Sequence, residues 1–167
     1  MRIDLSRHVP PGFDLWYELR FFAAGMTLAA SWSLSFLYRF VSALWALYGY
    51  RGIERYLLPG AVMPDFHTLL GNALTGFLIL AIWWIAAFVP AHYAHHVVGS
   101  KSIYLMRRLP NRWELHRRCW TLPLSVVLLC LIVAAILLLT YYGIYMAATP
   151  EECLTPHQWQ KIWSVLP

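Results

Sequence analysis

The chain has 167 residues, of which 60% are hydrophobic and 13% are charged, and its formal net charge is +5. Soluble globular domains contain about 25% charged residues, so this composition excludes that class and indicates a membrane protein. The length leaves no room for a second folded domain. We therefore expect one all-α membrane domain, in which the basic residues meet lipid or a protein partner and not nucleic acid.

The first segment, residues 1–20, does not resemble a cleavable signal sequence, because its charges are mixed and Pro10 and Pro11 interrupt it. From Asp14 onward, the sequence DLWYELRFF predicts a helix. This helix either lies at the membrane interface or forms the first turn of the first span, and the sequence favours neither.

The first span is predicted within residues 21–50. An uncharged apolar run extends from Phe21 to Tyr38 and continues beyond Arg39 to Tyr50, and about 20 apolar residues are enough to cross a bilayer. We interpret Arg39 as an interface marker whose aliphatic stem runs along the helix. The alternative is a buried charge that pairs with another span.

The outer loop, residues 51–67, has turn signals at Pro59-Gly60 and Pro64-Asp65 and is predicted to be an interfacial segment. The second span is predicted within residues 68–96. Tryptophan usually gathers at membrane interfaces, whereas Trp83 and Trp84 lie near the middle of this span. This placement suggests a protein contact or a ligand cavity there, but we favour ordinary packing of a bulky side chain, and Pro90 is expected to kink the helix.

Three histidines follow at spacings of three and four, which places them on one helical face: His92, His95 and His96. This pattern is a weak candidate for a divalent metal site. Histidines are also common at membrane interfaces, and no acidic residue or cysteine completes a ligand set. We therefore predict no metal and no cofactor.

The segment 97–120 is basic and contains six of the thirteen Lys and Arg residues. Ser100 is predicted to cap a first helix that Pro110 ends, and Asn111 with Glu114 to begin a second helix over 112–121 that Pro123 interrupts. Aromatic and apolar side chains alternate with the arginines, which favours either anionic headgroups or a carboxylate-lined protein groove as the partner. The candidate partner-binding residues are Tyr104, Leu105, Met106, Arg107, Arg108, Leu109, Arg112, Trp113, Glu114, Leu115, Arg117 and Arg118.

The third span is predicted within residues 121–148. Its sequence LSVVLLCLIVAAILLL fits a lipid-facing helix and a contact with a larger partner equally well. The outer tail, residues 149–167, places Trp159, Ile162, Trp163 and Leu166 on one face of a short amphipathic helix. We expect this helix on the outer leaflet, with a lid or receptor contact as the alternative.

Small residues predict that the first two spans pack against each other, because small side chains let helix backbones approach closely. They are Gly25, Ala29 and Ser33 in the first span and Gly71, Thr75 and Gly76 in the second.

The distribution of basic residues predicts a cytoplasmic amino terminus and an external carboxyl terminus, in a multi-pass protein of the plasma membrane. Arg2, Arg7, Arg20 and the six basic residues of segment 97–120 lie on one side, against Arg51, Arg55 and Lys161 on the other.

Catalytic and redox functions have little support in the sequence. The eight acidic residues are scattered singly except for Glu151 and Glu152, and no nucleophile is placed with a base. The cysteines, Cys119, Cys130 and Cys153, have neither disulfide nor metal spacing. We therefore expect no catalytic residues and no enzyme.

The order of segments resembles the first half of a type-2 ABC exporter permease: an interfacial segment, two spans joined by an outer loop, a helical cytoplasmic loop and a third span. The tract GSKSIYLMRRLPNRWELHRRC is similar to loops of small membrane proteins that accompany such exporters in gut Firmicutes. The resemblance implies that Tyr104 to Arg118 form a coupling helix in a groove of a separate ATPase subunit.

The chain also departs from this family, whose permeases usually have six spans. Three spans imply a half-permease or accessory subunit that works with another permease chain or a second copy of itself. The tract GSK at Gly99 to Lys101 lacks the pattern of a phosphate-binding loop, so ATP would act only through the partner subunit. The alternative hypothesis is a small membrane scaffold or regulator without a transport role, whose basic loop docks a cytoplasmic partner or anionic lipid.

Overall fold

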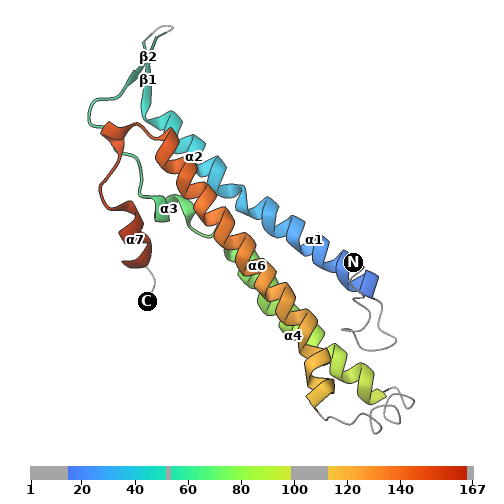
Figure 1. The fold of residues 1–167 in the computed structure, drawn as a ribbon. Helices are drawn as coiled ribbons and strands as arrows, with labels where there is room; N and C mark the ends of the chain where they lie inside the picture. The colour runs from blue at the N-terminus through green and yellow to red at the C-terminus, as the bar shows by residue number, and fades with distance from the viewer. Residues whose placement is uncertain (1–14, 52–53, 99–112, 165–167) are drawn as a thin grey trace, which may run out of the picture. The chain divides into compact units, whose positions relative to one another are not determined.

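The computed structural model describes residues 15–51, 54–98 and 113–164. Three stretches of helix in it are long and apolar enough to cross a membrane, namely Trp16–Ala46, Thr75–Ala94 and Cys119–Ala148. The prediction of an all-α membrane protein with three spans is therefore confirmed (Figure 1).

The helices and strands follow in chain order. They are α1 (Leu15–Ser33), α2 (Ser35–Ala46), β1 (Tyr48–Arg51), β2 (Glu54–Leu57), α3 (Phe66–Leu70), α4 (Thr75–Val98), α6 (Trp113–Ala148), the 3-10 helix η2 (Glu151–Cys153) and α7 (Gln158–Ser164).

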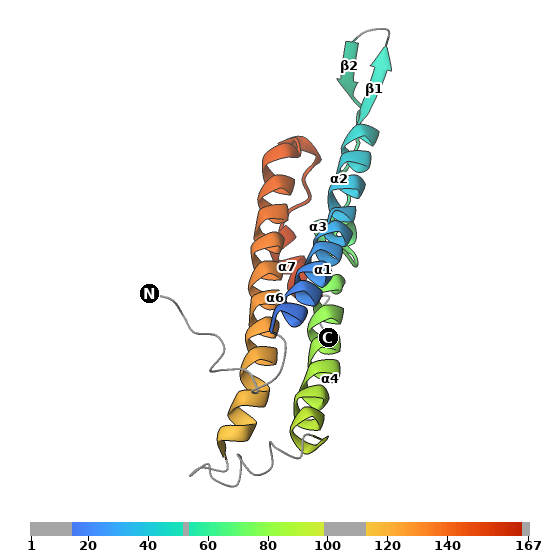
Figure 2. The ribbon, with the colours of Figure 1, turned by 90° about the vertical axis from the view of Figure 1, so that its right-hand side faces the viewer.

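The chain divides into two compact units. Unit 1 consists of Met1–Leu28 and Phe77–Val133, and unit 2 of Ala29–Gly76 and Ala134–Pro167. The described part of unit 1 is built from most of α1, most of α4 and the first half of α6, and in it α4 lies beside α6 (Figure 2).

The first span differs from the expected uninterrupted run. A turn at Leu34 separates α1 from α2, and α2 ends at Ala46, so the predicted extension to Tyr50 is not helical. Instead, β1 and β2 form an antiparallel hairpin in which Tyr48 pairs with Leu57. Tyrosine favours strands and Gly49 disfavours helix, which explains why this end of the apolar run leaves the helix.

The second span also begins later than predicted. The short helix α3 ends at Leu70, and the next residue, Gly71, has a φ of 42° that turns the chain before α4 starts at Thr75. A residue with a side chain adopts this backbone conformation only with strain, so glycine fits the turn. The Asn72 carbonyl accepts hydrogen bonds from the Thr75 hydroxyl and, at 3.0 Å, from Trp32 Nε1.

The predicted interruption at Pro123 is wrong, because α6 is one helix from Trp113 to Ala148 with Pro123 inside it. Pro90 likewise lies inside α4. The cytoplasmic helix that we expected to end near residue 121 is therefore the beginning of α6.

Unit 1 has an aromatic core between α1 and α4. The ring of Trp84 stacks on Phe88 with centroids 4.2 Å apart and meets the edge of Phe22 at 5.5 Å. Trp84 is fully buried, whereas Trp83 is 46% exposed. Aromatic contacts of this kind stabilise beyond the area that they bury, by about 1 kcal/mol per pair.

Unit 2 has its own core, formed by aromatic rings from α2, α3 and α6. Phe36 stacks on Tyr141 at 4.6 Å and meets the edge of Phe66 at 5.6 Å. Phe40 and Tyr145 extend the cluster, and all five rings are buried. The Ser33 and Tyr141 hydroxyls are hydrogen-bonded at 2.9 Å, so this core joins α1 to α6 as well.

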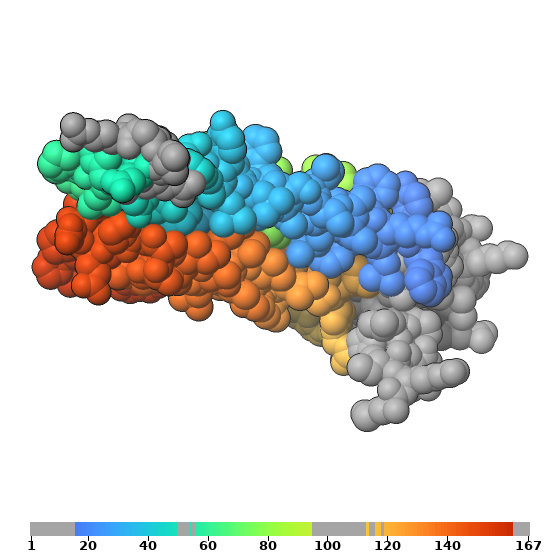
Figure 3. All heavy atoms as spheres, turned by 90° about the horizontal axis from the view of Figure 1, so that it is seen from above, coloured from blue at the N-terminus to red at the C-terminus, as the bar shows by residue number. Residues whose placement is uncertain are grey.

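Large apolar side chains remain exposed along α6. In the space-filling view, the yellow-to-orange first half of α6 forms part of the outer surface (Figure 3). Leu124, Leu128 and Leu131 of unit 1 are about half exposed, and so are Ile136 and Leu139 of unit 2. Such a surface is expected where a helix faces lipid.

A substitution at Gly76 tests the close contact between α1 and α4. A Cβ at Gly76 would lie 3.3 Å from the Ala29 Cα atom, whereas a Cβ at Gly143 of α6 would meet no atom within 4 Å. We expect Gly76→Leu to lower the free energy of unfolding by about 1 to 3 kcal/mol through overpacking. Thermal unfolding in detergent measures this loss, and Gly143→Leu is the matched control, expected to change stability by less than about 0.5 kcal/mol. Equal effects of the two substitutions would contradict the close contact.

Candidate functional site

A buried acid-base pair joins α1 to α4 in unit 1. Glu18 Oε1 lies 2.6 Å from His92 Nε2, and the two side chains are only 1% and 0% exposed. Either charge alone would be costly to bury, by several kcal/mol, so the pairing makes their burial possible. The two residues are 74 positions apart, and their pairing was not predicted from the sequence.

The hydrogen bonds around His92 define how many protons the pair holds. His92 Nδ1 lies 3.2 Å from the Cys119 carbonyl oxygen of α6. A carbonyl only accepts hydrogen bonds, so Nδ1 must carry a hydrogen. One further proton lies between Nε2 and Glu18 Oε1, either on the imidazole or on the carboxyl group. In both arrangements the pair as a whole is neutral.

The same contact explains why α6 continues through Pro123. Proline has no backbone N–H, so the carbonyl four residues earlier, that of Cys119, lacks its helical donor. His92 Nδ1 supplies the missing hydrogen bond from α4. Pro123 is therefore accommodated inside the helix because a neighbouring helix replaces the lost donor.

A second contact joins α4 to α6 closer to the basic segment. The Tyr93 hydroxyl and His116 Nδ1 are 2.6 Å apart, and the Trp113 ring lies beside the His116 ring at 6.0 Å. The last turns of α4 and the first turns of α6 are thus connected by two neighbouring residues of α4, His92 and Tyr93.

The predicted partner-binding residues fall mainly outside the described part of the chain. This is the case for Tyr104, Leu105, Met106, Arg107, Arg108, Leu109 and Arg112. Trp113 and Arg117 are exposed on the first turns of α6, Trp113 to 76%. Glu114, Leu115 and Arg118 belong to the same turns of α6, and their side chains are not among those described.

The histidine face does not form a metal site in the described residues. Both ring nitrogens of His92 are within hydrogen-bonding distance of Glu18 and Cys119, and the side chains of His95 and His96 lie outside the description. Among the side chains that the structure describes, no three of the types His, Cys, Asp and Glu come together as a metal-binding group.

The small residues have several different neighbours. In unit 2, Ala29 lies against Gly76, and a Cβ at Gly71 would collide with the Arg39 guanidinium. In unit 1, Gly25 lies against the Leu80 side chain. The hydroxyl groups of Ser33 and Thr75 are hydrogen-bonded to the Ala30 and Asn72 carbonyls, respectively.

A polar cluster in unit 2 attaches the tail to α3. Asp65 Oδ1 accepts hydrogen bonds from Lys161 Nζ at 2.7 Å, Thr155 Oγ1 at 2.7 Å and Gln158 Nε2 at 3.0 Å. Gln158 Oε1 in turn accepts from the Phe66 amide at 3.0 Å. These hydrogen bonds, with Lys161 contributing most, lower the pKa of Asp65 from 3.8 to about 2.

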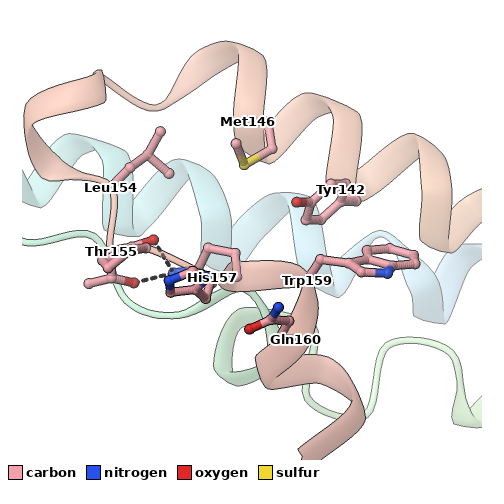
Figure 4. A pocket seen from close by; sticks show the side chains of 9 residues that line it. Tyr142, Met146, Leu154, Thr155, His157, Trp159 and Gln160 are labelled. Carbon is pink, nitrogen blue, oxygen red and sulfur yellow. Dashed lines mark hydrogen bonds between the residues drawn. The ribbon is translucent and has the colours of Figure 1, made fainter.

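The tail also borders a pocket of about 480 Å³ beside α6. Figure 4 shows Tyr142, Met146 and Leu154 on one side and Trp159 of α7 near Tyr142, with ring centroids 5.1 Å apart. Its polar groups on Thr155 and Gln158 are hydrogen-bonded to each other and to Asp65. His157 and Gln160 are further polar residues that line the pocket.

Comparison with known proteins gave no match, whether with protein-family models, with curated proteins or with solved structures.

The Glu18–His92 pair is tested by removing one partner or both. We expect Glu18→Leu and His92→Leu each to lower the free energy of unfolding by about 3 kcal/mol or more, because each leaves a polar partner buried alone. The double variant should cost less than the sum of the two by at least about 1 kcal/mol. Tyr93→Phe is the control, since it removes an exposed hydrogen bond that the neighbouring residue of α4 makes with His116 of α6, and it should cost about 1 kcal/mol or less. Additive losses in the double variant would disprove the pairing.

The Asp65 cluster predicts a stability loss at acid pH. Because the folded-state pKa is lowered, the contribution of Asp65 is complete above about pH 4 and is lost as the pH falls towards 2. Asp65→Asn should lower stability at pH 7 by about 1 kcal/mol and should flatten the dependence between pH 4 and 2. Thermal unfolding across this range measures both effects, with the exposed Glu152→Gln as control. An unchanged pH profile in Asp65→Asn would refute the assignment.

Proposed function

We propose that this chain is the membrane subunit of an ABC-type exporter in the plasma membrane, with segment 97–120 as the coupling element to a separate ATPase subunit. The observation that carries the proposal is the connection between the end of α4, which leads into this segment, and the first turns of α6, in which the segment ends. The end of α4 is joined to α6 through His92 and Tyr93, and to α1 through Glu18.

Coupling requires that a displacement of the loop reaches the spans. A loop between two independent helix ends would absorb such a displacement by local rotation. Here the contacts from His92 to Cys119 and from Tyr93 to His116 join both flanking helices, and the contact with Glu18 adds the first span. A push on the segment is therefore expected to move all three spans together at this end.

The chemistry of the segment fits a protein groove. Arginine forms bidentate pairs with carboxylates, and exposed tryptophan supplies apolar contact area. Trp113 and Arg117 lie exposed where α6 begins, and four further basic residues precede them, namely Lys101, Arg107, Arg108 and Arg112. An ATPase surface with acidic residues around an apolar groove would complement this arrangement.

Three spans are too few for a complete translocation path, so the proposal includes a second membrane chain, either another permease or a second copy. The exposed apolar side chains of α6 offer a surface for it or for lipid. In this function the chain is not an enzyme, and ATP is bound only by the partner subunit.

Affinity purification in mild detergent tests the proposal. An ATPase should co-purify with the tagged chain, and Arg107→Glu combined with Arg108→Glu and Arg112→Glu should reduce its recovery by at least tenfold, which corresponds to about 1.4 kcal/mol. Charge reversal acts because it replaces attraction to carboxylates by repulsion. Membrane insertion of the variant is measured in parallel by its recovery in the membrane fraction.

The matched control replaces the same arginines by lysine. Lysine keeps the charge that attracts anionic lipid but loses the bidentate geometry, so an ATPase groove should discriminate it from arginine and a lipid surface should not. Recovery of the ATPase after charge reversal, or its absence from the wild-type preparation, would favour the scaffold alternative, with lipid or another cytoplasmic protein as the partner.

A further inference from the structure

A cavity of about 300 Å³ lies in unit 1 between α1, α4 and α6. Most of its wall is apolar, with Phe22 from α1 and Val126 and Leu129 from α6. Glu18 and Trp84 also line it, and both are buried to 99% or more. Its volume is at the lower end of the range of small-molecule sites, which extends from about 300 to 1,000 Å³.

Two buried polar atoms of residues that line the cavity have no hydrogen-bonding partner among the described residues. They are Glu18 Oε2 and Trp84 Nε1. Leaving a buried polar group without a partner is costly, and most such groups in folded proteins are satisfied. The remaining wall is apolar except for Ser125, whose hydroxyl donates to the Leu122 carbonyl. The two atoms therefore indicate a ligand that brings polar groups into a mainly apolar cavity.

The chemistry of the two atoms defines the ligand. Trp84 Nε1 is a donor only, so it needs an acceptor. The proton shared with His92 lies at Glu18 Oε1, so Oε2 is an acceptor in both protonation arrangements and needs a donor. A hydroxyl group is the smallest group that provides a donor and an acceptor together.

The charge of the site favours a neutral ligand over a cation. His92 and Glu18 form a pair that is neutral as a whole, so no excess negative charge remains to hold an ammonium group. A neutral hydroxyl on an apolar chain matches the polar pair and the apolar wall at once.

We infer that this cavity is a binding site for an amphiphile with a hydroxyl group, which Glu18 Oε2 and Trp84 Nε1 hold while its apolar chain lies against Phe22, Val126 and Leu129. Glu18 and Trp84 lie within two of the three spans, so such a ligand reaches the site from the bilayer. Two sources have this chemistry, a single-chain alcohol and a diacylglycerol with its free hydroxyl. The site does not depend on the proposed exporter function.

The experiment uses the full chain in nanodiscs of phosphatidylcholine, a lipid without a hydroxyl group. The probes are 1-decanol and 1,2-dioctanoylglycerol, each compared with a counterpart in which the hydroxyl is blocked, decyl methyl ether and the 3-acetyl ester. Apparent dissociation constants follow from the dependence of the unfolding temperature on probe concentration. We expect at least one free hydroxyl probe to bind about tenfold more tightly than its blocked counterpart.

Trp84→Phe should reduce this discrimination to less than about threefold, because it removes the indole donor and keeps the ring stack on Phe88. Trp83→Phe is the matched control, since Trp83 is half exposed and does not line the cavity, and it should leave the discrimination unchanged. Binding of 1-decanol alone identifies a single-chain ligand, and binding of dioctanoylglycerol identifies a lipid.

The comparison of free and blocked probes on the wild-type chain does not require any variant to fold. Equal affinity for free and blocked probes, or no binding of either free probe, would overturn the site. The same conclusion follows if Trp84→Phe discriminates as strongly as the wild type.

Discussion

The hydrogen-bond chain from Glu18 through His92 to the Cys119 carbonyl is the constraint on which unit 1 depends. A carboxyl group and an imidazole are buried together inside a helical bundle, where neither is stable alone. Three helices must be in register for the chain to form, because each contributes one of its members. It also replaces the donor that Pro123 removes from α6. One set of contacts thus fixes the helix arrangement and allows an uninterrupted third span.

Unit 2 is stabilised by different interactions. Stacked and edge-on aromatic rings hold α2, α3 and α6 together, with Phe36 and Phe66 fully buried among them. The tail is attached through charge, since Asp65 gathers three donors from the chain around α7. The packing of the aromatic rings depends on ring shape. The hydrogen bonds of Asp65 depend on the protonation of its carboxyl group, so pH acts on the tail attachment and not on the ring stacking.

Glu18 links the two proposals through its two oxygen atoms. Oε1 contacts His92, and so belongs to the connection between the helix ends next to segment 97–120. Oε2 has no hydrogen-bonding partner among the described residues, and Glu18 lines the cavity. An amphiphile bound at Oε2 and a force applied through the loop would therefore act on the same side chain.

The sequence by itself determined the three spans, because crossing a bilayer requires only a sufficient length of apolar residues. It also predicted α7 in the tail. It did not predict the turn at Gly71, the β1–β2 hairpin or the continuity of α6 through Pro123, since turn geometry and replacement of a lost donor depend on neighbouring segments. Glu18 was assigned to the amino-terminal segment and His92 to a weak metal face. Only the tertiary structure decided their pairing, because the partner of a buried charge depends on which helix faces it, and hydropathy does not record this.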